Sequence, residues 1–242
     1  MSADGIPNAG AGVCIVIPAF REQSRIGPVV TAARGHGADV VVIDDGSPDA
    51  TAVEAEAAGA FVIRHPVNRG KGMALATGFE FARAHGYVAV ITMDADGQHD
   101  PAEIAKFLEA FRRTGLLVLV GNRMWDPHGM PWVRFLTNMF MSWMLSREMK
   151  QYVPDTQCGF RLFRCDVIPY VGAKSERFAA ESEILLHVAA RGMQIGSVRV
   201  STIYRGEKSK INPFLDTWRF FGMLRAHRRG RRAPRPAAAG KP

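Results

Sequence analysis

The stretch Tyr87-Val-Ala-Val-Ile-Thr-Met-Asp-Ala-Asp-Gly-Gln-His-Asp100 joins an apolar run to two carboxylates that lie one residue apart, Asp94 and Asp96. The run over 87–92 predicts a short buried strand, and the acids follow where this strand emerges at a sheet edge. In an extended chain both carboxylates point to the same side. Such a pair suits a hard divalent cation, which usually keeps substrate phosphates in its coordination shell. The alternative is a solvated turn, because Asp and Gly are common where strands end.

Outward from this stretch, short β-branched runs alternate with helical segments. Further strands are expected over 13–17, where Pro18 ends the strand, and over 40–43, 60–63 and 116–120, with helices over 22–34, 49–58, 72–84 and 103–113. This alternation predicts an α/β fold with a mostly parallel sheet and helices on both faces. In such sheets ligands bind at the carboxyl ends of the strands. Pro18, the pair Asp44-Asp45 and the Asp94/Asp96 pair all fall at such ends.

The second half of the chain is less regular. An amphipathic helix is expected over 178–191, a strand over 198–204 and an apolar, aromatic-rich helix over 214–224. The stretch over 132–145 is rich in Met, Phe and Trp. Segments 132–145 and 214–224 suit a protein core, or alternatively a face that lies on a membrane and admits a lipid tail.

Composition places the chain among ordinary globular proteins, with 242 residues, 47% hydrophobic and 22% charged. We see no apolar run near the roughly 18 residues that span a bilayer. The first dozen residues lack the basic start and apolar core of a signal peptide, so we expect a cytoplasmic protein. Cys14, Cys158 and Cys165 have no metal-site spacing and are expected to be buried thiols rather than redox groups.

The net charge of +8 is concentrated at the C-terminal end. From Arg225 onward the chain has six Arg, one Lys and no acid, which leaves about +1 for residues 1–224. We therefore expect a disordered N-terminus over 1–11, one domain over 12–224 and a disordered basic tail over 225–242. The tail either solubilises the chain or is attracted to anionic lipid, at roughly 1 kcal/mol per basic residue. Nucleic acid is the weaker third choice, since the folded part offers no basic stripe.

Two other loops follow expected strands. Asp44-Asp45-Gly46-Ser47-Pro48-Asp49 suits a turn with a helix cap, and its adjacent acids also suit ribose hydroxyls or a base edge. Asn68-Arg-Gly-Lys-Gly72 has the glycines and the charge of a phosphate cradle, with Lys71 in it, but lacks the P-loop spacing.

These motifs occur in a recognisable order. Ile17-Pro-Ala-Phe-Arg-Glu22, the 41–49 and 68–72 stretches and Met93-Asp-Ala-Asp-Gly-Gln-His99 together resemble the family 2 glycosyltransferases, which have the GT-A (Rossmann-like) fold. Three later stretches, 155–161, 178–183 and 204–210, are similar to the branch of dolichyl-phosphate (polyprenyl-phosphate) mannose and glucose synthases. The resemblance covers roughly residues 12–224.

The resemblance implies a nucleotide-sugar donor, Mg²⁺ or Mn²⁺, and a polyprenyl-phosphate acceptor at the membrane. Residues that fall at the family's nucleotide-sugar site are Pro18, Phe20, Glu22, Asp44, Asp45, Lys71, Asp94, Arg205, Ser209 and Lys210. Residues that fall at its metal site are Asp94, Asp96 and Gln98. Candidates for the chemistry itself are Asp96, Arg123, Arg134, Asp155 and Glu181. In one departure from the branch, transmembrane helices that often follow its catalytic domain are not seen in this sequence.

The expected reaction is direct displacement at the anomeric carbon, with inversion. A lipid phosphate is already anionic and needs Arg side chains to position it, for which Arg123 and Arg134 are candidates. A hydroxyl acceptor needs a general base instead, and Asp155 is the candidate unless it is only a turn residue after Pro154. Glu181 matches an acid close to the sugar. The alternatives to a polyprenyl-phosphate transferase are a soluble family 2 transferase with a hydroxyl acceptor and a non-catalytic nucleotide-sugar-binding subunit.

Overall fold

The structure, a computed structural model, describes residues 12–170, 179–203, 220–222 and 224–225. The chain divides into two compact units, 1–207 and 208–242. The described residues of the second unit are helical. The sheet, its covering helices and the candidate site described below all belong to the first unit. The domain boundaries expected from composition stay predictions.

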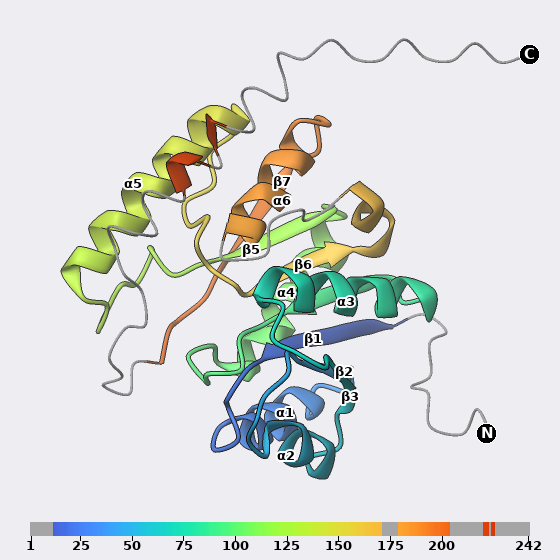
Figure 1. Cartoon of the computed structure of the whole chain (residues 1–242). Helices are drawn as coiled ribbons and strands as arrows, with labels where there is room; N and C mark the ends of the chain where they lie inside the picture. The colour runs from blue at the N-terminus through green and yellow to red at the C-terminus, as the bar shows by residue number, and fades with distance from the viewer. Residues whose placement is uncertain (1–11, 171–178, 204–219, 223, 226–242) are drawn as a thin grey trace, which may run out of the picture. The chain divides into compact units, whose positions relative to one another are not determined.

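The strands of the first unit form a seven-stranded sheet in the order β3-β2-β1-β4-β6-β5-β7 within the described residues (Figure 1). The strands are β1 (Val13–Ala19), β2 (Asp39–Asp44), β3 (Phe61–Arg64), β4 (Ala89–Thr92), β5 (Val118–Asn122), β6 (Arg161–Arg164) and β7 (Ile195–Arg199). Only β6 runs antiparallel to its neighbours. The expected α/β class with a mostly parallel sheet is confirmed.

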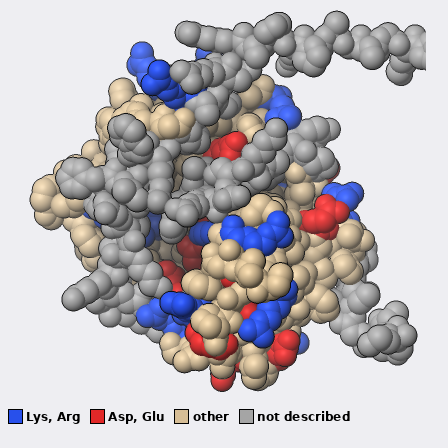
Figure 2. Space-filling model, in the orientation of Figure 1, with Lys and Arg blue, Asp and Glu red and all other residues tan. Residues whose placement is uncertain are grey.

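Helices cover both sides of this sheet (Figure 1). They are α1 (Ile26–Arg34), α2 (Thr51–Ala57), α3 (Lys71–Ala84), α4 (Ile104–Thr114), α5 (Trp132–Met149) and α6 (Ala179–Ala189), with 3₁₀ turns η1 (Pro101–Glu103) and η2 (Cys165–Tyr170). Residues 14–19 of β1 and 40–44 of β2 are all buried, as strands covered on both faces must be. Basic and acidic side chains intermix among the described residues on the face shown in Figure 2, in keeping with the small net charge expected for the folded part.

Three details of the predicted pattern are wrong. Pro18 does not end the first strand but pairs with Ile43 inside it. Proline is tolerated at this position because the pairing of β1 with β4 stops at Val16. The missing N–H of Pro18 therefore removes no hydrogen bond between these two strands. The strand expected over 198–204 lies at Ile195–Arg199, because its partner β5 ends at Asn122. Strand β6 was not predicted, since its apolar core is only Leu-Phe between two arginines.

Strand direction brings the candidate residues to one edge. Strands β1, β2 and β4 are parallel, and β5 runs the same way as β4 because both are antiparallel to β6. Their carboxyl ends therefore meet, which places the acids after β2 and β4 and the Arg after β5 along the same edge of the sheet.

Helix α3 begins near this edge of the sheet, and its position is set by close packing on strand β1. A Cβ atom at Gly78 would lie 2.3 Å from Val16 Cγ1, far inside any real contact distance. Val16 is fully buried, so its side chain has little room to move. Only glycine lets the helix approach the strand this closely.

Replacing Gly78 by Ala is expected to destabilise the protein by about 1–3 kcal/mol through overpacking, although Ala is the better helix former. Gly27→Ala in α1 is the control, since its added Cβ meets nothing nearer than 3.8 Å and should leave stability unchanged or raised. Urea unfolding midpoints of both variants test this, and equal midpoints would contradict the packing account.

Candidate functional site

The two adjacent acids at the carboxyl end of β2, Asp44 and Asp45, make different contacts. Asp45 accepts hydrogen bonds from the backbone N–H groups of Arg69 (2.9 Å) and Gly70 (2.7 Å), and lies 2.7 Å from His65 Nδ1. The other nitrogen of His65 lies 3.0 Å from Thr77 Oγ1 on α3. Asp45 therefore holds the loop that starts α3, and its carboxylate contacts protein groups rather than open solvent.

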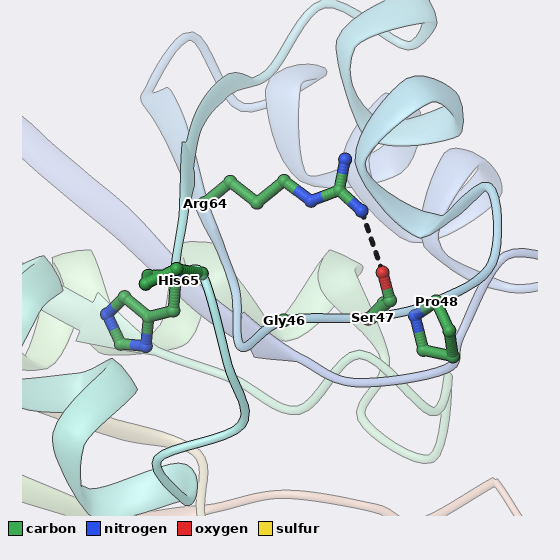
Figure 3. A pocket seen from close by; sticks show the side chains of 6 residues that line it. Gly46, Ser47, Pro48, Arg64 and His65 are labelled. Carbon is green, nitrogen blue, oxygen red and sulfur yellow. Dashed lines mark hydrogen bonds between the residues drawn. The ribbon is translucent and has the colours of Figure 1, made fainter.

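Asp44 is fully buried and has one unsatisfied oxygen. Its Oδ1 accepts from the Ser47 N–H at 3.0 Å, whereas Oδ2 lies 3.2 Å from Arg64 Nε without forming a hydrogen bond. Beside it lies a cavity of about 440 Å³. The cavity is lined by Gly46, Ser47, Pro48, Arg64, His65 and Pro66, and Figure 3 shows Arg64 reaching the Ser47 carbonyl, 2.8 Å away.

The residues expected around the nucleotide after β1 differ in exposure. Pro18 is buried, and Phe20 is exposed with the Arg21 guanidinium 5.1 Å from its ring centre. Glu22 is buried, its backbone N–H donates to Thr51 Oγ1 at 2.9 Å, and its carboxylate accepts from Arg25 at 3.0 Å. Phe20 is thus the side chain of this group that offers an apolar surface to a ligand.

The acid pair follows β4 in a tight loop. The Asp94 N–H donates to His99 Nδ1 at 3.1 Å, so Nδ1 is the unprotonated nitrogen of that ring, and burial lowers the pKa of His99. The Gln98 N–H donates to Asp96 Oδ1 at 3.0 Å. Burial and the charge of Asp94 both raise the pKa of Asp96. The charge of Asp94 therefore disfavours ionisation of Asp96.

Lys71, the first residue of α3, lies between two acids. Its Nζ is 2.5 Å from Asp94 Oδ1 and 2.7 Å from Glu181 Oε1 on α6. Burial alone would lower the pKa of Lys71, but the charges of Asp94 and Glu181 outweigh this and raise it. Burial would likewise raise the pKa of Asp94, but the charge and hydrogen bond of Lys71, together with the charges of His99 and Arg123, outweigh burial and lower that pKa. Asp94 and Glu181 therefore favour the charged form of Lys71.

The donor set fits Mg²⁺ or Mn²⁺ that is shared with a substrate. Asp94 and Asp96 supply carboxylates that repel each other, and Gln98 adds an amide oxygen on the same loop. No group of three or more His, Cys, Asp or Glu in the described part of the chain is arranged to hold a metal by itself. Mg²⁺ characteristically uses one or two carboxylates, with substrate phosphates and water completing its shell. The residues present match that requirement.

Arg123 and Asp155, both expected to act on the acceptor, are paired with each other. Arg123 Nε and Nη2 lie 2.7 and 3.0 Å from the two Asp155 oxygens, and the Arg123 backbone N–H donates to the same carboxylate at 3.2 Å. Burial would raise the pKa of Asp155, but Arg123 outweighs it and lowers the pKa. A buried carboxylate with a lowered pKa is a poor proton acceptor at neutral pH.

Arg161 is a site residue that the sequence did not single out. It is almost fully buried and donates to the carbonyl oxygens of Cys158 (2.7 Å), Thr156 (2.9 Å) and Glu181 (2.6 Å). Its Nη2 also lies 3.7 Å from Glu181 Oε2. Arg161 thus ties the 155–160 turn to the start of α6. The signal was present in the quoted motif 155–161, but nothing local distinguishes an inward-pointing Arg from a surface one.

The remaining candidates are less closely placed. Arg134 lies in the first turn of α5 and is half-buried. Arg205, Ser209 and Lys210 lie outside the described residues. The structure therefore brings together the acid pair, Lys71, Glu181 and the Arg123–Asp155 pair.

Comparison with known proteins gives consistent matches. The family model described as Glycosyl transferase family 2 matches residues 14–171. A UDP-N-acetylglucosamine–dolichyl-phosphate N-acetylglucosaminyltransferase of Methanococcus voltae is 29% identical, over 79% of this chain and 86% of its own. An undecaprenyl-phosphate mannosyltransferase of Micrococcus luteus is 26% identical, over 80% of this chain and 84% of its own.

A solved structure shares the fold. Glucosyl-3-phosphoglycerate synthase of Mycobacterium tuberculosis, in complex with Mn²⁺, UDP and glucosyl-3-phosphoglycerate, superposes with a TM-score of 0.71 at 19% identity. The match covers 90% of this chain and 80% of that one.

Replacing Asp155 by Asn is expected to cost about 3–5 kcal/mol at pH 7, because it leaves the Arg123 guanidinium buried without its counter-charge. A lowered carboxyl pKa contributes stability above its unfolded value of about 3.9 and loses it as the pH falls through the folded value. The difference between variant and wild type should therefore shrink below about pH 4.

The control is Asp166→Asn, which removes a similar Arg–Asp pair, with Arg164, at the surface. It is expected to change stability by no more than about 0.5 kcal/mol. Thermal unfolding from pH 7 to pH 3 measures both variants. Similar losses of stability in the two variants would show that burial does not increase the contribution of the Arg123–Asp155 pair to stability.

Proposed function

This chain belongs to glycosyltransferase family 2, and we propose that it transfers a hexose from a nucleotide sugar to a polyprenyl phosphate at the cytoplasmic face of the membrane, with Mg²⁺ or Mn²⁺ and inversion of the anomeric carbon. The expected enzyme class and GT-A fold are confirmed by the family match and the solved relative. One observation carries the rest of the proposal, namely that the acid pair, Lys71, Glu181 and Arg123 converge at one sheet edge.

The donor would lie along the carboxyl ends of β1, β2 and β4. The cavity after β2 suits the hydroxyls or base of a nucleoside, and Arg64, which lines it, lies 3.2 Å from the Asp44 carboxylate. Asp94, Asp96 and Gln98 would hold the cation, whose contribution when bound is to offset the charge that develops on the departing diphosphate. The solved structure of the same fold contains Mn²⁺ and UDP, which supports a divalent cation and a nucleoside diphosphate as ligands. Lys71 lies beside Asp94 and would add its positive charge at the same end of the diphosphate.

The acceptor is proposed to be a phosphate rather than a hydroxyl. A hydroxyl acceptor requires a general base, and Asp155, the candidate for it, is buried, paired with Arg123 and low in pKa. A phosphate oxygen is already anionic, so it needs only orientation, for which Arg134 is the proposed direct contact, whereas Arg123, buried against Asp155, would contribute its positive charge. The M. voltae and M. luteus relatives are named for polyprenyl-type phosphate acceptors, which supports the same choice.

Helix α5 suits contact with a membrane surface. Its buried side is formed by Asn138, Met141, Ser142, Leu145 and Met149. The large apolar side chains exposed on it are Trp132, Val133, Leu136, Met139, Phe140 and Trp143. Spacings of three and four residues put most of these on one face, as in a helix that lies in a bilayer interface. The basic sequence after Arg225 would add attraction to anionic lipid.

The described part of the chain includes no helix with the length and apolar character needed to cross a bilayer.

Incubation with Mn²⁺, undecaprenyl phosphate and labelled GDP-mannose, UDP-glucose or UDP-N-acetylglucosamine is expected to move label into the lipid fraction. Asp96→Ala should reduce this transfer by about 100-fold or more, because charge on the leaving group is no longer offset. Asp100→Ala in the same loop is the control, since Asp100 only caps η1 and its loss should cost about 1 kcal/mol of stability. No lipid-linked label with any of these donors, or full activity of Asp96→Ala, would overturn the proposal.

Changing both Trp132 and Trp143 to Ser is expected to weaken binding to vesicles of anionic lipid. The control pair is Val53→Ser with Val67→Ser, which removes exposed apolar side chains outside α5. Co-sedimentation with anionic and with zwitterionic vesicles measures the loss and its dependence on charge. Equal binding by the two double variants would rule out α5 as the contact surface.

A further inference from the structure

Four side chains of alternating charge form a row across the site. Asp94 contacts Lys71 at 2.5 Å, Lys71 contacts Glu181 at 2.7 Å, and Arg161 approaches the second Glu181 oxygen at 3.7 Å. Exposure falls along the row, from 30% for the Asp94 side chain to 1% for that of Arg161. The end at Asp94 is thus open to a ligand, whereas the end at Arg161 is fixed inside the protein.

Lys71 and Glu181 are held by contacts that do not involve Asp94. Asp45 accepts hydrogen bonds from the N–H groups of Arg69 and Gly70, which sets the position where α3 begins. Arg161 holds the Glu181 carbonyl at 2.6 Å, which sets the start of α6. The Lys71–Glu181 pair would therefore persist if Asp94 turned to another partner.

A divalent cation must compete with Lys71 for Asp94. Two cations on one carboxylate repel each other, and near a protein surface unit charges at a few ångströms interact by several times the thermal energy. The helix N-terminus at Lys71 adds further positive potential. A bound diphosphate would reverse this balance, since its negative charge attracts both cations.

We propose that Lys71, held by Glu181, is a built-in counter-cation that occupies Asp94 in place of the metal and makes tight metal binding depend on the nucleotide diphosphate. This inference rests on the proposed metal site. It assigns Lys71 and Glu181 as positioning residues that set metal affinity, beyond any contact of Lys71 with the donor.

Mn²⁺ binding to the full chain tests the inference without any transfer reaction. Titration calorimetry with Mn²⁺ alone, and with Mn²⁺ in the presence of UDP or GDP, gives the affinities. Lys71→Met is expected to tighten binding of Mn²⁺ alone by roughly tenfold or more. Lys71→Arg keeps the charge and should bind Mn²⁺ as weakly as wild type.

Glu181→Gln should act in the opposite direction. It removes one of the two carboxylates that share Lys71, so the ammonium pairs more fully with Asp94 and Mn²⁺ alone should bind more weakly than to wild type. This variant keeps the shape of the side chain, and it tests the inference even if Lys71→Met does not fold.

The outcomes separate this inference from the proposed function. One outcome is that wild type binds Mn²⁺, that Asp96→Ala abolishes binding, and that Lys71→Met and Glu181→Gln leave the affinity unchanged. In that case the counter-cation role of Lys71 is contradicted, whereas the proposed metal site is supported. If wild type binds no Mn²⁺ with UDP or with GDP, the metal site fails and the counter-cation with it.

Discussion

The ion pairs of Lys71 with Asp94 and Glu181 are the interaction on which the site depends. One ammonium group joins the loop after β4 to the start of α6, and it does so from the first turn of α3. Charges in this setting are stable only when each has a counter-charge, because a partly buried ion loses much of its hydration. The arrangement keeps an acid pair at the sheet edge while leaving Asp94 partly exposed to a ligand.

The turn over 155–160 contacts several of the residues that form this arrangement. Asp155 fixes Arg123 after β5, and the Gly159 carbonyl accepts a hydrogen bond from Thr92 Oγ1 at 2.9 Å. Gly159 also lies so close to Asp94 that a Cβ there would be 2.9 Å from its Oδ2. Arg161 then connects the same turn to α6. The proposed metal ligand Asp94, Arg123 and Lys71 are therefore joined through one connected set of contacts, which suits a reaction that depends on orientation and electrostatics.

Local patterns in the sequence predicted strands β4 and β5, which precede and follow the acid pair along the chain. They also predicted the sheet edge at which the candidate site residues lie. They predicted this much because buried parallel strands leave long β-branched runs and because polar loops follow them. The different tasks of Asp44 and Asp45 were not predictable, since they depend on contacts with residues about 20 or more positions away. The same holds for Arg161 and for antiparallel β6, whose partners are set by tertiary packing. The ion pair of Asp155 with Arg123 was not predictable either, because the two residues lie 32 positions apart in the chain.

A crystal structure of the chain with Mn²⁺ and UDP or GDP tests the central claim most directly. The account predicts density for the ion between the diphosphate and the Asp94/Asp96 loop, with Lys71 still paired to Glu181 and withdrawn from Asp94. An ion bound away from that loop, or a diphosphate bound elsewhere than at the carboxyl edge of β1, β2 and β4, would contradict it.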